Sequence, residues 1–107
     1  MKKNLILVAV VTLLALVSCQ TKPVKTIENL KAAITGETTA SAKYKAFAQQ
    51  ANNEGLDTIA KLFEAASQAE AIHAANHTKV LIELGEKMDS IKPEFEVKTT
   101  VENLQAA

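Results

Sequence analysis

Two long stretches of the chain place apolar or small residues at alternating steps of three and four. This spacing is typical of a helix that packs along one side against near-parallel neighbours. The first stretch runs from about Ile27 to Asn53, and its seam positions are Ile27, Leu30, Ile34, Glu37, Ser41, Tyr44, Ala48 and Ala51. The second runs from about Asp57 to Leu84, with seam positions Ile59, Phe63, Ala66, Glu70, His73, His77, Val80 and Leu84. The pattern predicts two helices.

The residues around these stretches predict where the helices begin and end. Thr26 is the expected N-cap of the first helix. Gly55 and Gly85 follow the two periodic stretches, and glycine readily adopts the left-handed conformation that ends many helices. Because the connection between the helices is short, they must be antiparallel neighbours. The predicted fold class is therefore all-α, an antiparallel helical hairpin.

Composition supports an all-α protein and argues against nucleic acid as a partner. Alanine, leucine, glutamate and lysine, which are strong helix formers, are abundant, and only 4% of the residues are aromatic. The chain has 12 Lys+Arg and 12 Asp+Glu residues, and none of the basic residues is arginine. Nucleic-acid binding calls for a clustered basic face, which this balanced composition does not offer.

The N-terminal segment belongs to a different physical class. Lys2 and Lys3 precede an apolar run from Leu5 to Val17 that is too short to cross a bilayer and has the size of a signal-peptide core. Cys19, the only cysteine, follows this run as in bacterial lipoprotein signals, where the cysteine is lipidated. The alternative is a secretory signal with a chance cysteine. We expect an extracytoplasmic lipoprotein anchored to the membrane of a bacterial cell envelope through Cys19.

Three polar residues interrupt the two seams. Glu37 lies in the middle of the first helix, and Glu70 and His73 lie in the middle of the second, at a similar distance along the chain from the turn. Buried carboxylates repel one another unless a cation neutralises them. A Glu on one helix facing Glu-x-x-His on its partner is half of a carboxylate-bridged di-metal site, with donors that suit iron or manganese. Alternatively, Glu70 points to water and His73 is a satisfied core histidine.

The helix pair resembles the N-terminal half of rubrerythrins. The residues that carry the resemblance are Gly36, Glu37, Tyr44, Phe47, Ala48, Glu54, Gly55, Ile59, Ala60, Phe63, Glu70 and His73. The resemblance implies half of a ferritin-like four-helix bundle, with Glu37, Glu70 and His73 as metal ligands. It also implies that Tyr44 lies against the metal cluster, in a catalytic role, although simple core packing explains Tyr44 equally well. His77, one turn beyond His73, is an extra ligand, a donor to a ligand or, more simply, a partly exposed histidine.

An internal repeat divides the rest of the chain. Residues 26–33 recur as residues 100–107 at an offset of 74, with six of eight residues identical. We therefore expect a signal peptide at 1–18, a tether at 19–25, the helix pair at 26–85, and a crossover with the start of a third helix at 86–107. The same offset, applied to Glu37, places the next ligand beyond Ala107. A truncated gene, a fragment and a natural half-length protein would each give such a sequence.

The resemblance implies a di-iron oxidoreductase that reduces hydrogen peroxide at the membrane surface. The chain has no Cys-x-x-Cys pair for a rubredoxin-like site, so an external electron donor would be needed. The di-iron centre would be completed by a second chain in a homodimer or by a missing half. Two alternatives stay open, namely a non-catalytic iron-binding or ferroxidase-like module and an inactive truncated half-protein.

Overall fold

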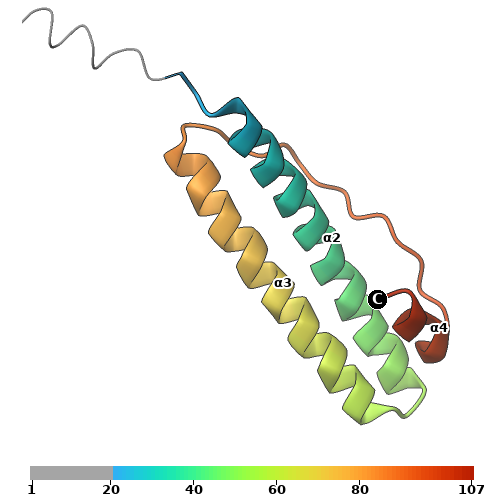
Figure 1. The fold of residues 1–107 in the computed structure, drawn as a ribbon. Helices are drawn as coiled ribbons and strands as arrows, with labels where there is room; N and C mark the ends of the chain where they lie inside the picture. Colours follow the sequence, from blue (N-terminus) through green and yellow to red (C-terminus); the bar gives the residue numbers. More distant parts are fainter. Residues whose placement is uncertain (1–20) are drawn as a thin grey trace, which may run out of the picture.

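The computed structural model describes residues 21–107, and the predicted signal peptide and Cys19 lie outside this part. Its elements are the helices α2 (Val24–Asn53), α3 (Asp57–Glu83) and α4 (Thr100–Gln105). Helices α2 and α3 form an antiparallel hairpin, and the extended segment 86–99 returns beside α2 to bring α4 against the end of the hairpin near the turn (Figure 1). The predicted all-α hairpin is confirmed. Within residues 21–107, no helix is long and apolar enough to cross a membrane.

The C-terminal ends of α2 and α3 lie where the sequence predicts them, whereas the start of α2 does not. Gly55 and Gly85 have φ angles of 74° and 78°, which confirms the expected left-handed residues after α2 and α3. The expected N-cap, Thr26, is wrong, because α2 begins at Val24 and Pro23 occupies the N-cap position without a side-chain hydrogen bond. Proline presets the backbone φ angle for a helix and lacks the N–H that a cap would satisfy. The last two residues of the predicted tether are therefore helical.

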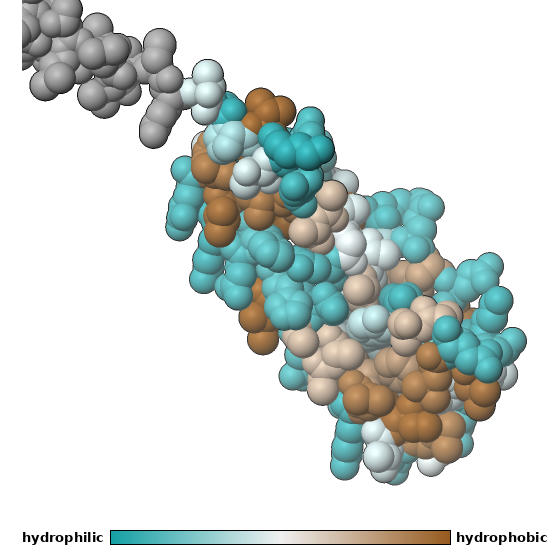
Figure 2. Space-filling model, viewed as in Figure 1, coloured by the Kyte–Doolittle hydropathy of each residue, from teal (hydrophilic) through white to brown (hydrophobic). Residues whose placement is uncertain are grey.

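The hydrophobic core is divided into two clusters, one toward each end of the hairpin. Buried Ile27, Ile34 and Leu81 form the cluster near the start of α2. Buried Phe47, Ala48 and Phe63 form the cluster near the turn. In Figure 2, apolar surface likewise gathers near both ends, with a more polar stretch between them. The middle of the hairpin is therefore less apolar than its two ends.

The buried face of α3 differs at one end from the predicted seam. Leu81 is fully buried, whereas the expected seam residue Val80 is exposed. A strict seven-residue repeat drifts by about 20° per heptad around a straight α-helix, so three heptads from Ile59 shift the seam by roughly 60°. That rotation brings the next residue, Leu81, to face α2.

Polar contacts fix α4 beside the turn of the hairpin. Thr99 caps α4 in a capping box with Glu102, and the hydrogen bonds from Thr99 hold the pKa of the Glu102 carboxyl below its ordinary value. Glu54 accepts a 2.9 Å hydrogen bond from the backbone N–H of Thr100 and another from its hydroxyl. Asn103 is buried and bonds the backbone of Lys98 in both directions, at 2.9 and 3.0 Å. The Glu54 contacts attach the second copy of the sequence repeat to the hairpin, whereas the bonds of Thr99 and Asn103 stabilise α4 itself.

Candidate metal centre

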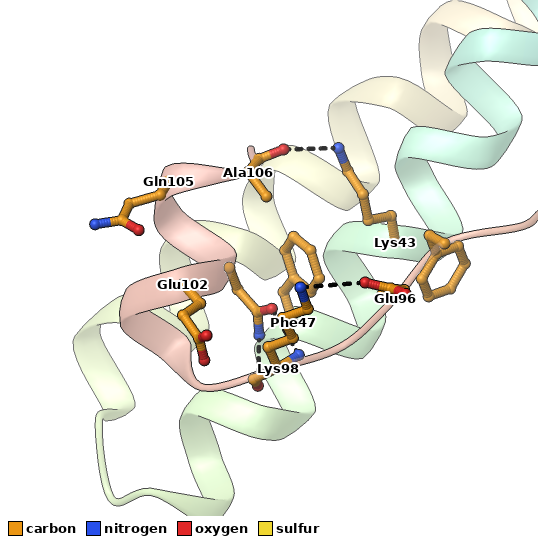
Figure 3. Close-up of a pocket in the computed structure, with 9 residues that line it drawn as sticks. Lys43, Phe47, Glu96, Lys98, Glu102, Gln105 and Ala106 are labelled. Atoms are coloured by element: carbon orange, nitrogen blue, oxygen red, sulfur yellow. Dashed lines mark hydrogen bonds and ion pairs between the residues drawn. The ribbon is translucent and has the colours of Figure 1, made fainter.

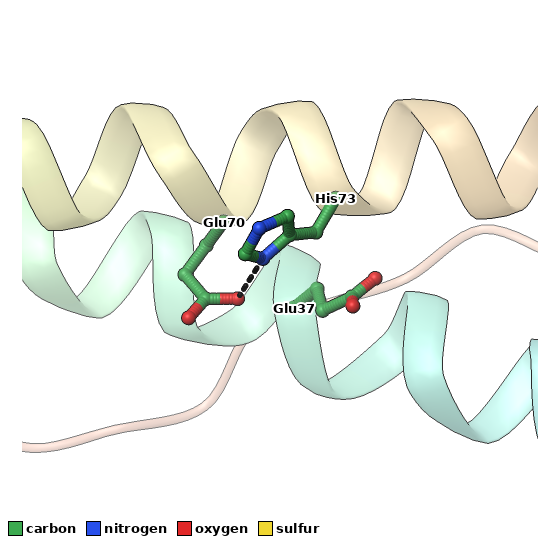
Figure 4. A group of neighbouring side chains, drawn as sticks. All are labelled: Glu37, Glu70 and His73. Atoms are coloured by element: carbon green, nitrogen blue, oxygen red, sulfur yellow. Dashed lines mark ion pairs between the residues drawn. The ribbon is translucent and has the colours of Figure 1, made fainter.

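The structure brings the three predicted ligands together in the middle of the hairpin. Glu37 extends from α2, and Glu70 and His73 extend from successive turns of α3 (Figure 4). One ligand atom from each residue lies within 4.8 Å of the other two. This convergence follows from antiparallel packing, because Glu37 and Glu70 are nearly equidistant from the turn.

Exposure increases from α2 toward the outer side of α3. The side chains of Glu37, Glu70 and His73 are 17%, 28% and 56% exposed, respectively. Glu37 and Glu70 are thus partly covered, as expected of seam positions, whereas most of His73 faces solvent. The alternative interpretation of His73 as a core histidine is therefore wrong, because the hairpin covers only one side of the cluster.

Glu70 and His73 contact each other along α3. His73 Nδ1 lies 3.5 Å from Glu70 Oε2, as residues three positions apart on one helix face can do. A carboxylate oxygen and an imidazole nitrogen therefore point into the same space, which Glu37 borders from α2. Two carboxylates and one imidazole are a donor set that suits iron or manganese, so these residues fit half of a di-metal centre.

His77 makes a contact with the cluster that the sequence left open. Its Nδ1 lies 2.9 Å from Glu37 Oε2, across the interface between α3 and α2. His77 is partly exposed, as the simplest interpretation expected, yet it also has a specific partner. The clue in the sequence was its seam position one turn beyond His73.

A reciprocal pair of serines lies next to the cluster on the side toward the turn. The Ser41 hydroxyl donates to the Ser67 carbonyl oxygen at 2.9 Å, and the Ser67 hydroxyl donates to the Ser41 carbonyl oxygen at 2.8 Å. Ser41 is one turn from Glu37, and Ser67 is one turn from Glu70. The small side chains allow the two helix backbones to approach closely beside the cluster.

Tyr44 belongs to the aromatic cluster near the turn. Its ring stacks on the ring of Phe63, with the centroids 6.0 Å apart, and its centroid lies 6.3 Å from that of the Phe47 ring. Tyr44 is two turns from Glu37 along α2. This packing accounts for the position of the ring, and the catalytic role of Tyr44 stays a prediction.

A hollow lies away from the candidate metal ligands, where α4 meets α2. It encloses about 460 Å³ and is lined on the α2 side by Lys43 and Phe47 (Figure 3). Lys98 and Glu96, also in its lining, form a 3.2 Å ion pair with each other, and Lys43 donates to the carbonyl oxygen of Ala106 at 3.4 Å. Its charged groups are thus engaged within the chain, so we regard this hollow as part of the α4 junction.

The sequence of the chain is similar to those of known proteins. The sequence model of the Rubrerythrin family matches residues 28–107. Nigerythrin from Nitratidesulfovibrio vulgaris is 62% identical over 48 residues, which are 45% of this chain and 24% of that protein. Rubrerythrin-2 from Clostridium acetobutylicum is 37% identical over 62 residues, 58% of this chain and 34% of that protein. The chain thus spans about a quarter to a third of these relatives, and no solved structure is significantly similar to it.

Proposed function

Because the chain belongs to the rubrerythrin family, which implies iron binding, we propose that Glu37, Glu70 and His73 form half of a di-iron centre that reduces hydrogen peroxide. The observation that carries this proposal is the convergence of two carboxylates and one imidazole within 4.8 Å at the junction of α2 and α3. Such a donor set from two antiparallel helices is the half-site of carboxylate di-iron bundles.

The proposed reaction needs electrons from outside the chain. Reduction of one hydrogen peroxide to two waters consumes two electrons and two protons, and bound iron would supply the electrons by passing from the ferrous to the ferric state. An external donor would then reduce the centre, since the sequence holds no Cys-x-x-Cys pair for a rubredoxin-like site. The residues of the chain provide the charge and geometry: Glu37 and Glu70 neutralise the cations, and His73 adds a nitrogen donor.

We further propose that a second copy of the chain completes the centre. Exposed Leu62 and Val80 lie three and two turns from His73 along α3, so apolar side chains flank the open side of the cluster. Two copies related by a two-fold axis would bury this face and supply the four carboxylates and two imidazoles of a full di-iron site. Lipidation of Cys19 would hold this dimer at the membrane surface of the cell envelope.

The proposed function is tested with the full chain purified in detergent. We expect about one iron per chain, as half of a two-metal site, and consumption of hydrogen peroxide when a reductant is supplied. Glu70→Ala should lose both properties. Glu64→Ala, which removes an exposed carboxylate on the same helix, should keep both.

The other outcomes separate the alternatives. Iron uptake without peroxide consumption would identify an iron-binding or ferroxidase-like module. A chain that takes up no iron would be an inactive half-protein. Equal loss of iron from Glu64→Ala and Glu70→Ala would contradict the assignment of the site. Sedimentation with and without manganese tests the shared centre, which predicts a dimer that depends on metal.

A further inference from the structure

The two histidines of α3 have different relations to the cluster. His73 contributes a nitrogen within 4.8 Å of the Glu37 and Glu70 ligand atoms. His77, one turn further, is not one of these three converging residues, and its Nδ1 instead lies 2.9 Å from Glu37 Oε2. The contact crosses from α3 to α2, so it joins the two helices that carry the ligands.

The chemistry of the pair fixes the direction of this hydrogen bond. An ionised carboxylate can only accept hydrogen bonds, so His77 must donate from a protonated Nδ1. Glu37 Oε2 then accepts this hydrogen bond, and the remaining lone pairs of the carboxylate are left for a cation. A hydrogen bond of this kind restricts the rotation of the carboxylate and so orients it as a ligand.

Burial makes this contact more important for Glu37 than it would be for the other carboxylate. Glu37 has the least exposed side chain of the three ligands, at 17%. A partly buried carboxylate has fewer water molecules around it, and a charged acceptor gains more from a protein donor than a neutral one does. Glu70 already has His73 beside it on its own helix, whereas the partner of Glu37 comes from the opposite helix.

We propose that His77 is a positioning residue, which holds the Glu37 carboxylate in the orientation in which it binds the metal. This inference rests on the proposed function in one respect, namely that Glu37 is a ligand. It adds a residue that contacts the ligand and leaves the coordination itself to Glu37, Glu70 and His73.

A pair of isosteric variants tests the hydrogen bond. In His77→Asn, the side-chain amide nitrogen can occupy nearly the place of Nδ1 and donate to Glu37. His77→Leu has nearly the shape of asparagine and has no donor. Substitutions of groups that orient metal ligands typically weaken metal binding about 10- to 100-fold. We expect this loss in Mn²⁺ affinity for His77→Leu and a loss of less than about tenfold for His77→Asn.

The same pair separates positioning from a merely structural role. A merely structural role, in which the hydrogen bond only joins α3 to α2, would lower the helix content of metal-free His77→Leu below that of His77→Asn, although leucine has the higher helix propensity. The measurements are Mn²⁺ titration of the full chain in detergent by electron paramagnetic resonance, and helix content by circular dichroism. A nitrogen-15 NMR spectrum of the wild-type imidazoles should also show His77 protonated at Nδ1.

The outcomes distinguish this inference from the function on which it rests. Weaker Mn²⁺ binding by His77→Leu than by His77→Asn, at equal helix content, supports the positioning role. Equal Mn²⁺ affinity of both variants and the wild type overturns it while leaving the metal centre in place. A wild-type chain that binds no Mn²⁺ would overturn both the metal centre and the role of His77.

Discussion

Glu70→Ala should change stability in opposite directions with and without metal. The carboxylates of Glu37 and Glu70 each place an oxygen within 4.8 Å of the other when no cation is present. Two like charges at that distance repel by about 1 kcal/mol in water and roughly 3.5 kcal/mol at an effective dielectric constant of 20. Both side chains are partly exposed, so the lower figure is the better guide.

Two smaller terms accompany this repulsion. Alanine has a helix propensity a few tenths of a kcal/mol better than glutamate, which also favours the variant. Loss of the Glu70–His73 contact opposes it weakly, because His73 is mostly exposed and such pairs contribute little. The metal-free variant should therefore gain about 1 kcal/mol, which corresponds to a melting temperature roughly 4–8 °C higher.

Manganese should reverse this order. At a free concentration of 100 times its dissociation constant, a bound metal stabilises the wild type by about 2.7 kcal/mol. The variant should gain almost none of this, so the wild type becomes the more stable chain. The assay is thermal unfolding followed by circular dichroism, first in chelator and then in Mn²⁺.

Glu64→Ala is the matched control for this experiment. It has the same gain in helix propensity on α3, at an exposed position, but it should keep the full response to manganese. A Glu70→Ala chain that melts at a lower temperature than the wild type in chelator would refute the repulsion argument. A Glu70→Ala chain that keeps the wild-type shift in Mn²⁺ would remove Glu70 from the ligands.

Three further predictions concern the anchor, the core and α4. Cys19→Ser should release the protein from the membrane fraction or leave an unprocessed precursor, which fractionation and mass spectrometry would detect; unchanged processing would argue against lipidation. Leu81→Ala should lower the free energy of unfolding by about 2–5 kcal/mol in denaturant titrations, because Leu81 is fully buried, whereas Val80→Ala should cost much less. Because hydrogen bonds from Thr99 lower the pKa of Glu102 in the folded chain, this carboxyl stabilises α4 at neutral pH and loses that effect as the pH falls through the lowered pKa; NMR of the α4 amides should show this loss, and Thr99→Ala should abolish it.

The helices could be predicted from the sequence because their signals are local. Apolar spacing fixes the length of each helix, and Gly55 and Gly85 mark the ends by a conformation that other residues adopt reluctantly. The start of α2 was harder, since Thr26 and Pro23 are both acceptable near a helix N-terminus. The prediction that Val80 is buried was wrong for another reason. Val80 and Leu81 are adjacent apolar residues, and only the rotation of the whole helix decides which of them is buried.

The convergence of the three candidate ligands could be predicted from the sequence, whereas their surroundings could not. Equal distance from the turn was enough to bring Glu37 and Glu70 together, whatever the details of packing. The exposure of His73 and the bond between His77 and Glu37 depend on the rotation of α3 and on side-chain torsions, which spacing does not determine. For α4, the sequence Thr99-x-x-Glu102 was a readable capping-box signal, but the partner of Thr100, Glu54, is 46 residues away.

The serine pair connects the packing of the hairpin to the geometry of the cluster. Ser41 and Ser67 lie between the two apolar clusters of the hairpin. Their reciprocal hydrogen bonds join the helix backbones one turn from Glu37 and Glu70. Larger apolar side chains at these positions would strengthen the core but force the helices apart. Because a glutamate side chain has limited reach, wider spacing would separate the carboxylates and leave no shared space for a cation. The small side chains in the middle of the core are therefore a condition for the proposed metal centre, and a bound metal would in turn hold the helices together where apolar contacts are few.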